Sequence, residues 1–225
     1  MLVNGTVMTQ IFHPSTNTFS KATIFGGLLI VAAASFAWDQ INRSAYVTEA
    51  DVVRDQPVPF SHEHHVSGLG IDCRYCHTTV EQSAFAGLPA TEICMGCHSQ
   101  IWKDSPMLAP VRESYRSGKP LRWTRVHDVP DFVYFNHSIH VAKGIGCESC
   151  HGRVDRMPLM RRAHSLQMSW CLECHEAPER HIRDRSEIYS FGEVPTTTAR
   201  EHGLELVREY GIETKQLLDC WICHR

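Results

Sequence analysis

Apolar residues are distributed unevenly along this chain of 225 residues. Residues 22–38, ATIFGGLLIVAAASFAW, form an uncharged run between Lys21 and Asp39. A run of this length is at the short end for a helix that crosses a bilayer, and Trp38 lies where an interfacial aromatic residue is expected. The pattern predicts a transmembrane anchor over residues 22–38.

A cleavable signal peptide is the alternative interpretation of this run, because small residues surround Ser35 and Ala37. Residues 1–21 contain one Lys and no Arg, which is unlike the basic start of a signal peptide. We therefore expect an uncleaved anchor. Residues 1–21 would then be a cytoplasmic N-terminal tail, and residues 39–59 a linker.

The cysteines have a regular spacing. All ten fall into five Cys-x-x-Cys pairs, and a histidine follows each pair directly. Two cysteines one helical turn apart can both bond to one haem, and the next histidine can coordinate its iron. The spacing predicts five covalently bound haem c groups. Their attachment residues are Cys73, Cys76, Cys94, Cys97, Cys147, Cys150, Cys171, Cys174, Cys220 and Cys223, and the proximal iron ligands are His77, His98, His151, His175 and His224.

Zinc sites and disulfide frameworks are the alternatives for paired cysteines. A zinc ribbon has no need of a histidine after every second cysteine, so haem explains the pattern better. The formal net charge of -3 gives no sign of the basic surface that a nucleic-acid-binding protein carries. We therefore expect no nucleic-acid partner.

The number of haems also predicts the fold class. Five macrocycles within residues 60–225 would supply most of the apolar interior themselves. We predict a mainly α fold with extensive loops, a multihaem cytochrome c fold wrapped around five haems, plus one N-terminal transmembrane helix. A lobe over residues 60–100 would hold haems 1 and 2, a lobe over 123–180 haems 3 and 4, and residues 181–225 haem 5.

Two further segments have a readable pattern. Leu204, Val207 and Tyr210 recur at helical spacing before Gly211, which predicts a helix that packs over the fifth motif. The prolines of residues 101–134 predict a long loop.

Residues 60–77 and 135–151 repeat one pattern, in which a phenylalanine and two histidines three residues apart precede the cysteine pair. One short turn can thus offer an imidazole to each of two irons. Surface histidines ahead of a structural motif are the alternative. The predicted distal histidines are these two pairs together with His127, whose loop would reach back to haem 2: His62, His65, His137, His140 and His127.

Methionine is a further candidate distal ligand, because His/Met ligation raises the potential of a haem. Met157 and Met168 are the preferred candidates for one such site, and apolar packing is the alternative. His64 is expected to face solvent. His164, His181 and His202 are expected at the surface or beside the ligands.

Several stretches carry a family resemblance. FSHEHHVSGLGIDCRYCH with ATEICMGCH, WTRVHDVPDFVYFNHSIHVAKGIGCESCHG at 123–152 and LQMSWCLECH at 166–175 together closely resemble the pentahaem cytochrome c subunit of bacterial alternative complex III. The resemblance covers nearly the whole chain. It implies mostly bis-His ligation with one His/Met haem. It also implies an iron–sulfur subunit, polytopic quinol-binding subunits and a monohaem cytochrome c as partners, with a soluble cytochrome, a copper protein or an oxidase as acceptor.

The predicted function is therefore an electron relay from quinol-oxidising subunits to a periplasmic acceptor, with no catalytic residue in this chain. Attachment of haem c occurs outside the cytoplasmic membrane, which places the haem domain on the periplasmic or extracellular side of a bacterial cytoplasmic membrane that the chain crosses once. A self-sufficient membrane-anchored multihaem quinol dehydrogenase is one alternative. A catalytic multihaem reductase is another, although none of the five motifs departs from Cys-x-x-Cys-His.

Overall fold

The computed structural model describes residues 11–192 and 198–224. These residues are mainly helical, and the β-type pairings among them are isolated bridges such as Val133 with His224. The predicted mainly α fold is thereby confirmed. The chain divides into two compact units, Met1–Val47 and Thr48–Arg225.

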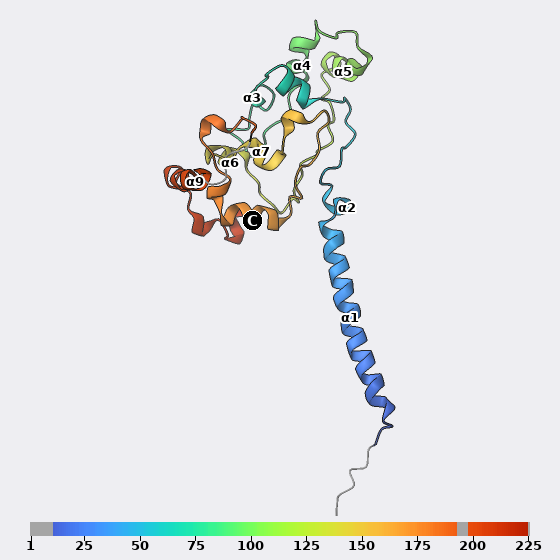
Figure 1. The fold of residues 1–225 in the computed structure, drawn as a ribbon. Helices are drawn as coiled ribbons and strands as arrows, with labels where there is room; N and C mark the ends of the chain where they lie inside the picture. Colours follow the sequence, from blue (N-terminus) through green and yellow to red (C-terminus); the bar gives the residue numbers. More distant parts are fainter. Residues whose placement is uncertain (1–10, 193–197, 225) are drawn as a thin grey trace, which may run out of the picture. The chain divides into compact units, whose positions relative to one another are not determined.

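The first unit is built on one long helix, α1 (Ser15–Arg43), which contains the predicted span 22–38 (Figure 1). Its apolar side chains are exposed, for example Phe25 and Leu29, and none of its residues is buried. Its length and composition fit a membrane span, and a signal sequence near the N-terminus would have the same features. Residues 1–10 of the predicted tail lie outside the described residues.

The second unit begins within the segment that the sequence pattern assigned to a linker. The backbone N–H of Asp51 donates to the Arg162 carbonyl at 2.7 Å. The side chain of Gln56 pairs with both backbone groups of Thr124, each at 2.9 Å. Val58 is buried. Residues 48–59 are therefore packed against the rest of this unit, after the short helix α2 (Ala45–Thr48).

Each cysteine pair lies on a short helix. These five helices are α3 (Cys73–Cys76), α4 (Thr91–His98), α7 (Cys147–His151), α8 (Met168–Glu176) and α10 (Cys220–Cys223). Residues three apart on a helix share one face, so each motif presents both thiols on the same side. The remaining α-helices of the second unit are α5 (Ala109–Ser117), α6 (His137–Ala142) and α9 (Thr198–Glu209), and a one-turn π-helix, η1, spans Glu63–Gly68.

The segment 101–134 contains a helix, so the prediction of one long loop was wrong. Pro106 begins the 3-10 turn Pro106–Leu108, and Pro110 lies in the first turn of α5. Proline is tolerated at a helix start, where its missing N–H has no intrahelical partner. Leu108 and Val111 pack against Val58, and α4 lies against the same cluster. The prolines therefore mark helix starts rather than an extended loop.

Helix α9 forms where the sequence predicts it, but it packs differently. Leu206 and Tyr210 are buried against Ile182, while Leu204 is 41% exposed. Gly203 permits this approach, because a Cβ there would collide with the Glu179 carbonyl. The predicted packing over the fifth motif is therefore wrong, since the sequence pattern could not show which neighbour offers a matching surface.

Candidate haem-binding site

The ten cysteines form no disulfide, since each carries a free thiol. Burial raises the pKa of Cys150 to about 12 and that of Cys174 to about 11, so both thiols are protonated at neutral pH. A disulfide framework is therefore wrong for this fold. Free thiols, paired on one face of a helical turn, are the arrangement that covalent haem attachment needs.

The predicted proximal histidines are held through one ring nitrogen. In four of the five, Nδ1 lies against a backbone carbonyl: His77 on Gly87 (2.7 Å), His98 on Ile101 (3.1 Å), His175 on Leu217 (2.9 Å) and His224 on Phe132 (3.1 Å). A carbonyl only accepts, so Nδ1 carries the proton in each ring. The lone pair of Nε2 is then free to bind a metal.

The fifth proximal histidine, His151, lies among other imidazoles. Burial lowers its pKa well below the ordinary value, and the neighbouring rings of His127 and His137 lower it further. His151 is therefore neutral at physiological pH. The neutral ring is the form that coordinates iron.

In three of the five motifs, the histidine faces a second imidazole, and the three distances between ring centroids are nearly the same. The ring centroids of His65 and His98 are 6.2 Å apart, and both His137 with His151 and His140 with His175 are at 6.3 Å. Two imidazoles on opposite sides of one metal ion have centroids about 6 Å apart, given metal–nitrogen bonds of about 2 Å. These pairs therefore match bis-His ligation at the second, third and fourth motifs.

The distal members of these pairs are tethered in the same way as the proximal ones. Nδ1 lies 2.7 Å from the Ser61 carbonyl in His65, 2.8 Å from the Ala84 carbonyl in His137 and 2.7 Å from the Asn136 carbonyl in His140. Each ring is thus fixed in one tautomer with Nε2 free. Paired imidazoles, free Nε2 atoms and same-face thiols all fit a covalently bound haem.

The repeated phenylalanines set the angle of these rings. Phe60 contacts His62 edge-on (4.9 Å, 87°) and stacks on His65 (4.4 Å, 24°). Phe135 contacts His137 edge-on (4.7 Å, 89°) and stacks on His140 (4.5 Å, 28°). The sequence repeat is therefore a structural repeat.

His62 lies in the environment of the first motif. Burial, together with smaller contributions from His77 and His65, lowers its pKa to about 4, so the ring is neutral. Its Nδ1 is buried and has no hydrogen-bond partner among the described residues. His62 thus differs from the tethered distal rings.

His127 lies beside the third motif and not the second. Its ring centroid is 4.2 Å from that of His151, which is too close for an iron between the two rings. Burial lowers its pKa to about 4, and its Nε2 is buried without a partner in the described part of the chain. The position facing His98, which the sequence pattern assigned to His127, is filled by His65.

The two candidate methionines have opposite environments. Met157 is 2% exposed and enclosed by protein atoms, which leaves no open face for a flat macrocycle. Met168, the first residue of α8, is 60% exposed. Met168 is thus the better placed of the two.

Other histidines lie away from the paired rings. His64 is exposed, as predicted. His164 stacks on Trp170 at 5.0 Å, and His202 pairs with Asp184 at 2.9 Å. The pKa of His181 is lowered by burial.

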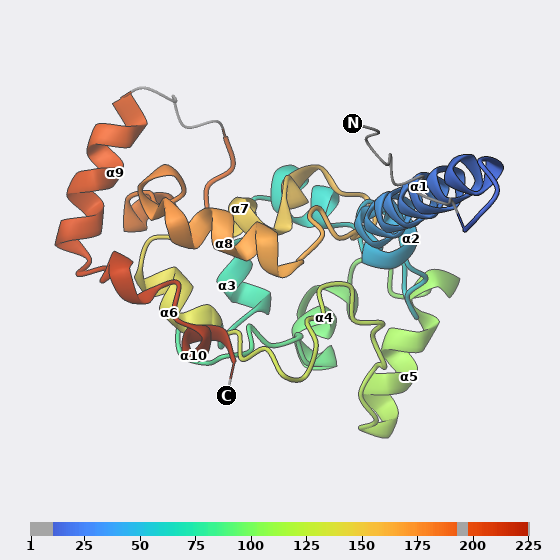
Figure 2. The ribbon, with the colours of Figure 1, turned by 90° about the horizontal axis from the view of Figure 1, so that it is seen from below.

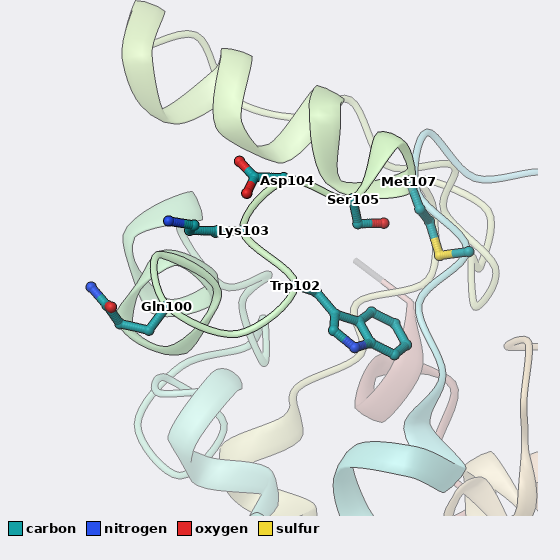
Figure 3. A pocket seen from close by; sticks show the side chains of 6 residues that line it. All are labelled: Gln100, Trp102, Lys103, Asp104, Ser105 and Met107. Atoms are coloured by element: carbon teal, nitrogen blue, oxygen red, sulfur yellow. The ribbon is translucent and has the colours of Figure 1, made fainter.

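A surface pocket of about 570 Å³ adjoins the second motif (Figure 3). Trp102 follows Ile101, whose carbonyl holds His98, and its ring lies parallel to that of His64 at 6.4 Å. Trp102 has φ 53°, a conformation that is strained for a bulky residue. No signal in the sequence pointed to this pocket, which is lined by Gln100, Trp102, Lys103, Asp104, Ser105 and Met107.

Comparison with known proteins agrees with this geometry. Residues 133–225 match the family of cytochrome c7 and related cytochromes c. Over 131 residues the chain is 37% identical to the menaquinone reductase multihaem cytochrome c subunit of Nitratidesulfovibrio vulgaris Hildenborough, an alignment that covers 58% of each protein. The second unit therefore resembles a multihaem cytochrome c domain, in which haem c is covalently bound.

Proposed function

We propose that this protein is a membrane-anchored pentahaem cytochrome c that relays electrons within a quinone-linked membrane complex of the alternative complex III type. The observation that carries the proposal is the set of three imidazole pairs at 6.2–6.3 Å, each ending on a Cys-x-x-Cys-His helix. At these motifs, both axial positions of a haem would be filled. A relay needs no open coordination position, whereas a catalytic haem does.

Five covalently bound haem c groups supply the one-electron chemistry, and the chain orients them. The thiol pairs would attach the rings, and the five motif histidines would bind iron from the proximal side. His65, His137 and His140 take the distal positions of the second, third and fourth motifs. His62 takes the distal position of the first motif, because it is buried, neutral and near His77.

For the one His/Met site, which the fifth motif would provide, the candidate is Met168. Met168 is exposed. His127 keeps a buried Nε2 without a partner among the described residues, but its ring lies beside His151 of the third motif and not at the fifth. Replacing Met168 with Leu should remove the charge-transfer band of a thioether-ligated ferric haem, while Met157→Leu should leave it; the reverse result would transfer the role to Met157.

In the proposed direction, electrons move from the membrane quinol site towards an acceptor on the periplasmic side. The quinol site would lie on polytopic subunits, an iron–sulfur subunit and a monohaem cytochrome c would complete the complex, and a soluble cytochrome, copper protein or oxidase on the periplasmic side would take the electrons. No residue of this chain would be catalytic. Helix α1 would anchor the domain in the bacterial cytoplasmic membrane.

A second candidate function has the electrons moving in the opposite direction, towards the quinone. The relative in Nitratidesulfovibrio vulgaris is a subunit of a menaquinone reductase. In a complex of that kind, this chain would take electrons from a periplasmic donor and deliver them towards the quinone. The two candidates use the same residues and differ only in the redox partners at the ends of the path.

Mild-detergent extraction of native membranes, a native gel stained for haem and mass identification of comigrating proteins would test both candidates. We expect an iron–sulfur subunit and polytopic quinol-binding proteins to comigrate. Net quinol oxidation or net quinone reduction by the extracted complex then fixes the direction. Migration as a lone small protein that oxidises a quinol analogue would overturn the relay and favour a self-sufficient quinol dehydrogenase.

A further inference from the structure

We infer that the five haem-attachment motifs follow one another in space in the order second, first, third, fourth, fifth, so that the second and fifth motifs form the two ends of the electron path. This inference rests on the proposed relay function and goes beyond it by fixing the path. It differs from the order of the motifs along the chain. Each junction is defined by contacts between named residues.

The first and second motifs are joined by one turn of the chain. His62 and His65 flank this turn, and the rings of His65 and His98 form the pair of the second motif. The backbone N–H of Ile71, two residues before the first motif, donates to the His65 carbonyl at 3.0 Å. The hydroxyl of Tyr75, in α3, lies 3.8 Å from the Cβ position of Gly96, in α4.

The first and third motifs are joined by a cluster of side chains. Arg74, in α3, lies 4.4 Å above the ring of Tyr189, and the Tyr189 hydroxyl donates to Glu81 at 2.8 Å. The residue before Tyr189 is Ile188, whose carbonyl accepts from the backbone N–H of Cys147 at 3.1 Å. Tyr189 thus ties the first residue of the third motif to the first motif.

Two more contacts cross this junction. Nδ1 of His137 donates to the Ala84 carbonyl, in the loop after the first motif. The backbone N–H of Ser138, in α6, donates to the Ser83 carbonyl at 3.2 Å. In both views of the ribbon, α4 lies on the side of α3 towards α5 (Figure 1 and Figure 2). The third motif therefore follows the first motif in space, although the second motif precedes it in sequence.

The path continues through α6 and α8. His137 and His140 lie on α6, and they face the histidines of the third and fourth motifs respectively. Nδ1 of His175, in the fourth motif, donates to the carbonyl of Leu217, in the segment that leads to the fifth motif. These contacts join the third motif to the fourth and the fourth to the fifth.

The exposure of the cysteines is an independent sign of the two ends. Cys97 and Cys220 are the two exposed cysteines of the ten, and the other eight are half-buried. They belong to the second and the fifth motif. Both ends are therefore open to redox partners, while the first, third and fourth motifs are more enclosed.

The test is a matched pair of variants of the full-length, haem-loaded protein. His65→Ala and His140→Ala remove equivalent residues of the two repeats, and each should turn one ferric haem from low-spin to high-spin. The readout is the set of paramagnetic proton signals of the other four haems. We expect His65→Ala to displace the signals of one neighbouring haem and His140→Ala to displace those of two. Displacement of two sets by His65→Ala would overturn the inferred order.

A second measurement avoids disturbing the ligands. Because all native cysteines are predicted to be bonded to haem, a cysteine introduced at Lys103 or Lys215 can be labelled alone with a nitroxide. The label at position 103 should broaden the signals of the second-motif haem most, and the label at 215 those of the fifth. Equal broadening of several haems by either label would overturn the assignment of the ends. Neither experiment measures quinol turnover, so failure of the order and failure of the proposed function are separable.

Discussion

The two repeats of this protein have nearly the same ring geometry on different backbones. Phe60 and Phe135 each meet one imidazole edge-on and stack on the next, at matching distances and angles. The first repeat does this from the π-helix η1, and the second from the α-helix α6. Seven residues separate His65 from Cys73, but six separate His140 from Cys147. A π-turn absorbs one extra residue, so the ring geometry is kept despite the insertion.

The surroundings of the two repeats differ more than their rings. Gly70 and Gly144 occupy the same place before the cysteine pair, with φ 67° and 79°. No atom lies within 4 Å of the Cβ position of Gly70, whereas that of Gly144 is 2.6 Å from the Arg183 carbonyl and 2.7 Å from the Tyr210 ring. The first repeat faces outward at one end of the inferred path, and the second is enclosed in its middle.

The largest expected effect on stability comes from substituting these two glycines. Gly144→Ala should lower the free energy of unfolding by about 3 kcal/mol or more, because backbone strain adds to a collision with a carbonyl that cannot rotate away. Gly70→Ala should cost about 1–2 kcal/mol, from the positive φ alone. Denaturant unfolding of both variants measures the difference. Equal losses would show that the two surroundings do not differ energetically.

The next difference is that His137 of the second repeat is held by a hydrogen bond, whereas the equivalent His62 of the first repeat has no such bond among the described residues. His62→Ala and His137→Ala should each turn one haem high-spin and leave covalent haem content unchanged. His137→Ala should also lower the free energy of unfolding by about 1 kcal/mol more, because only His137 loses a hydrogen bond, that to Ala84. Optical spectra and urea unfolding check both parts. An unchanged spectrum in either variant would remove that histidine from the distal ligands.

The π-turn should be dispensable. Deleting Gly68 gives the first repeat the spacing of the second, and we expect every haem to stay low-spin and the free energy of unfolding to change by less than about 1 kcal/mol. Adding one glycine after Ala142 should be worse, because Lys143 bonds to the Tyr210 and Gly211 carbonyls. Loss of a low-spin haem in the deletion variant would show that the extra residue has a role of its own.

The smallest effect lies outside both repeats and gives a baseline for surface changes. Asp184 raises the pKa of His202 in the folded protein. The stabilisation by this exposed pair is therefore fully present below the unfolded pKa of about 6.5, and is lost as the pH rises through the folded value. Asp184→Asn should lower Tm by less than about 2 °C at pH ~5.5 and leave it unchanged at pH ~9. His202→Gln is the control, and a loss that grows with pH would contradict the assignment.

The sequence by itself determined the local chemistry. Histidine after every Cys-x-x-Cys pair predicted covalent haem, and the free thiols on helical turns agree with it. The spacing of His62 and His65, and of His137 and His140, predicted a turn that serves two irons. Such features depend on residues a few positions apart, and the geometry of one turn fixes them.

The tertiary structure alone decided what each local unit faces. It placed His127 beside His151 rather than at the second motif, turned Leu206 of α9 inward in place of Leu204, and enclosed Met157 while leaving Met168 open. It also placed the third motif next to the first, although the second motif lies between them in the sequence. These outcomes depend on which surfaces pack across long separations in the chain, and periodicity in one segment carries no information about the shape of another.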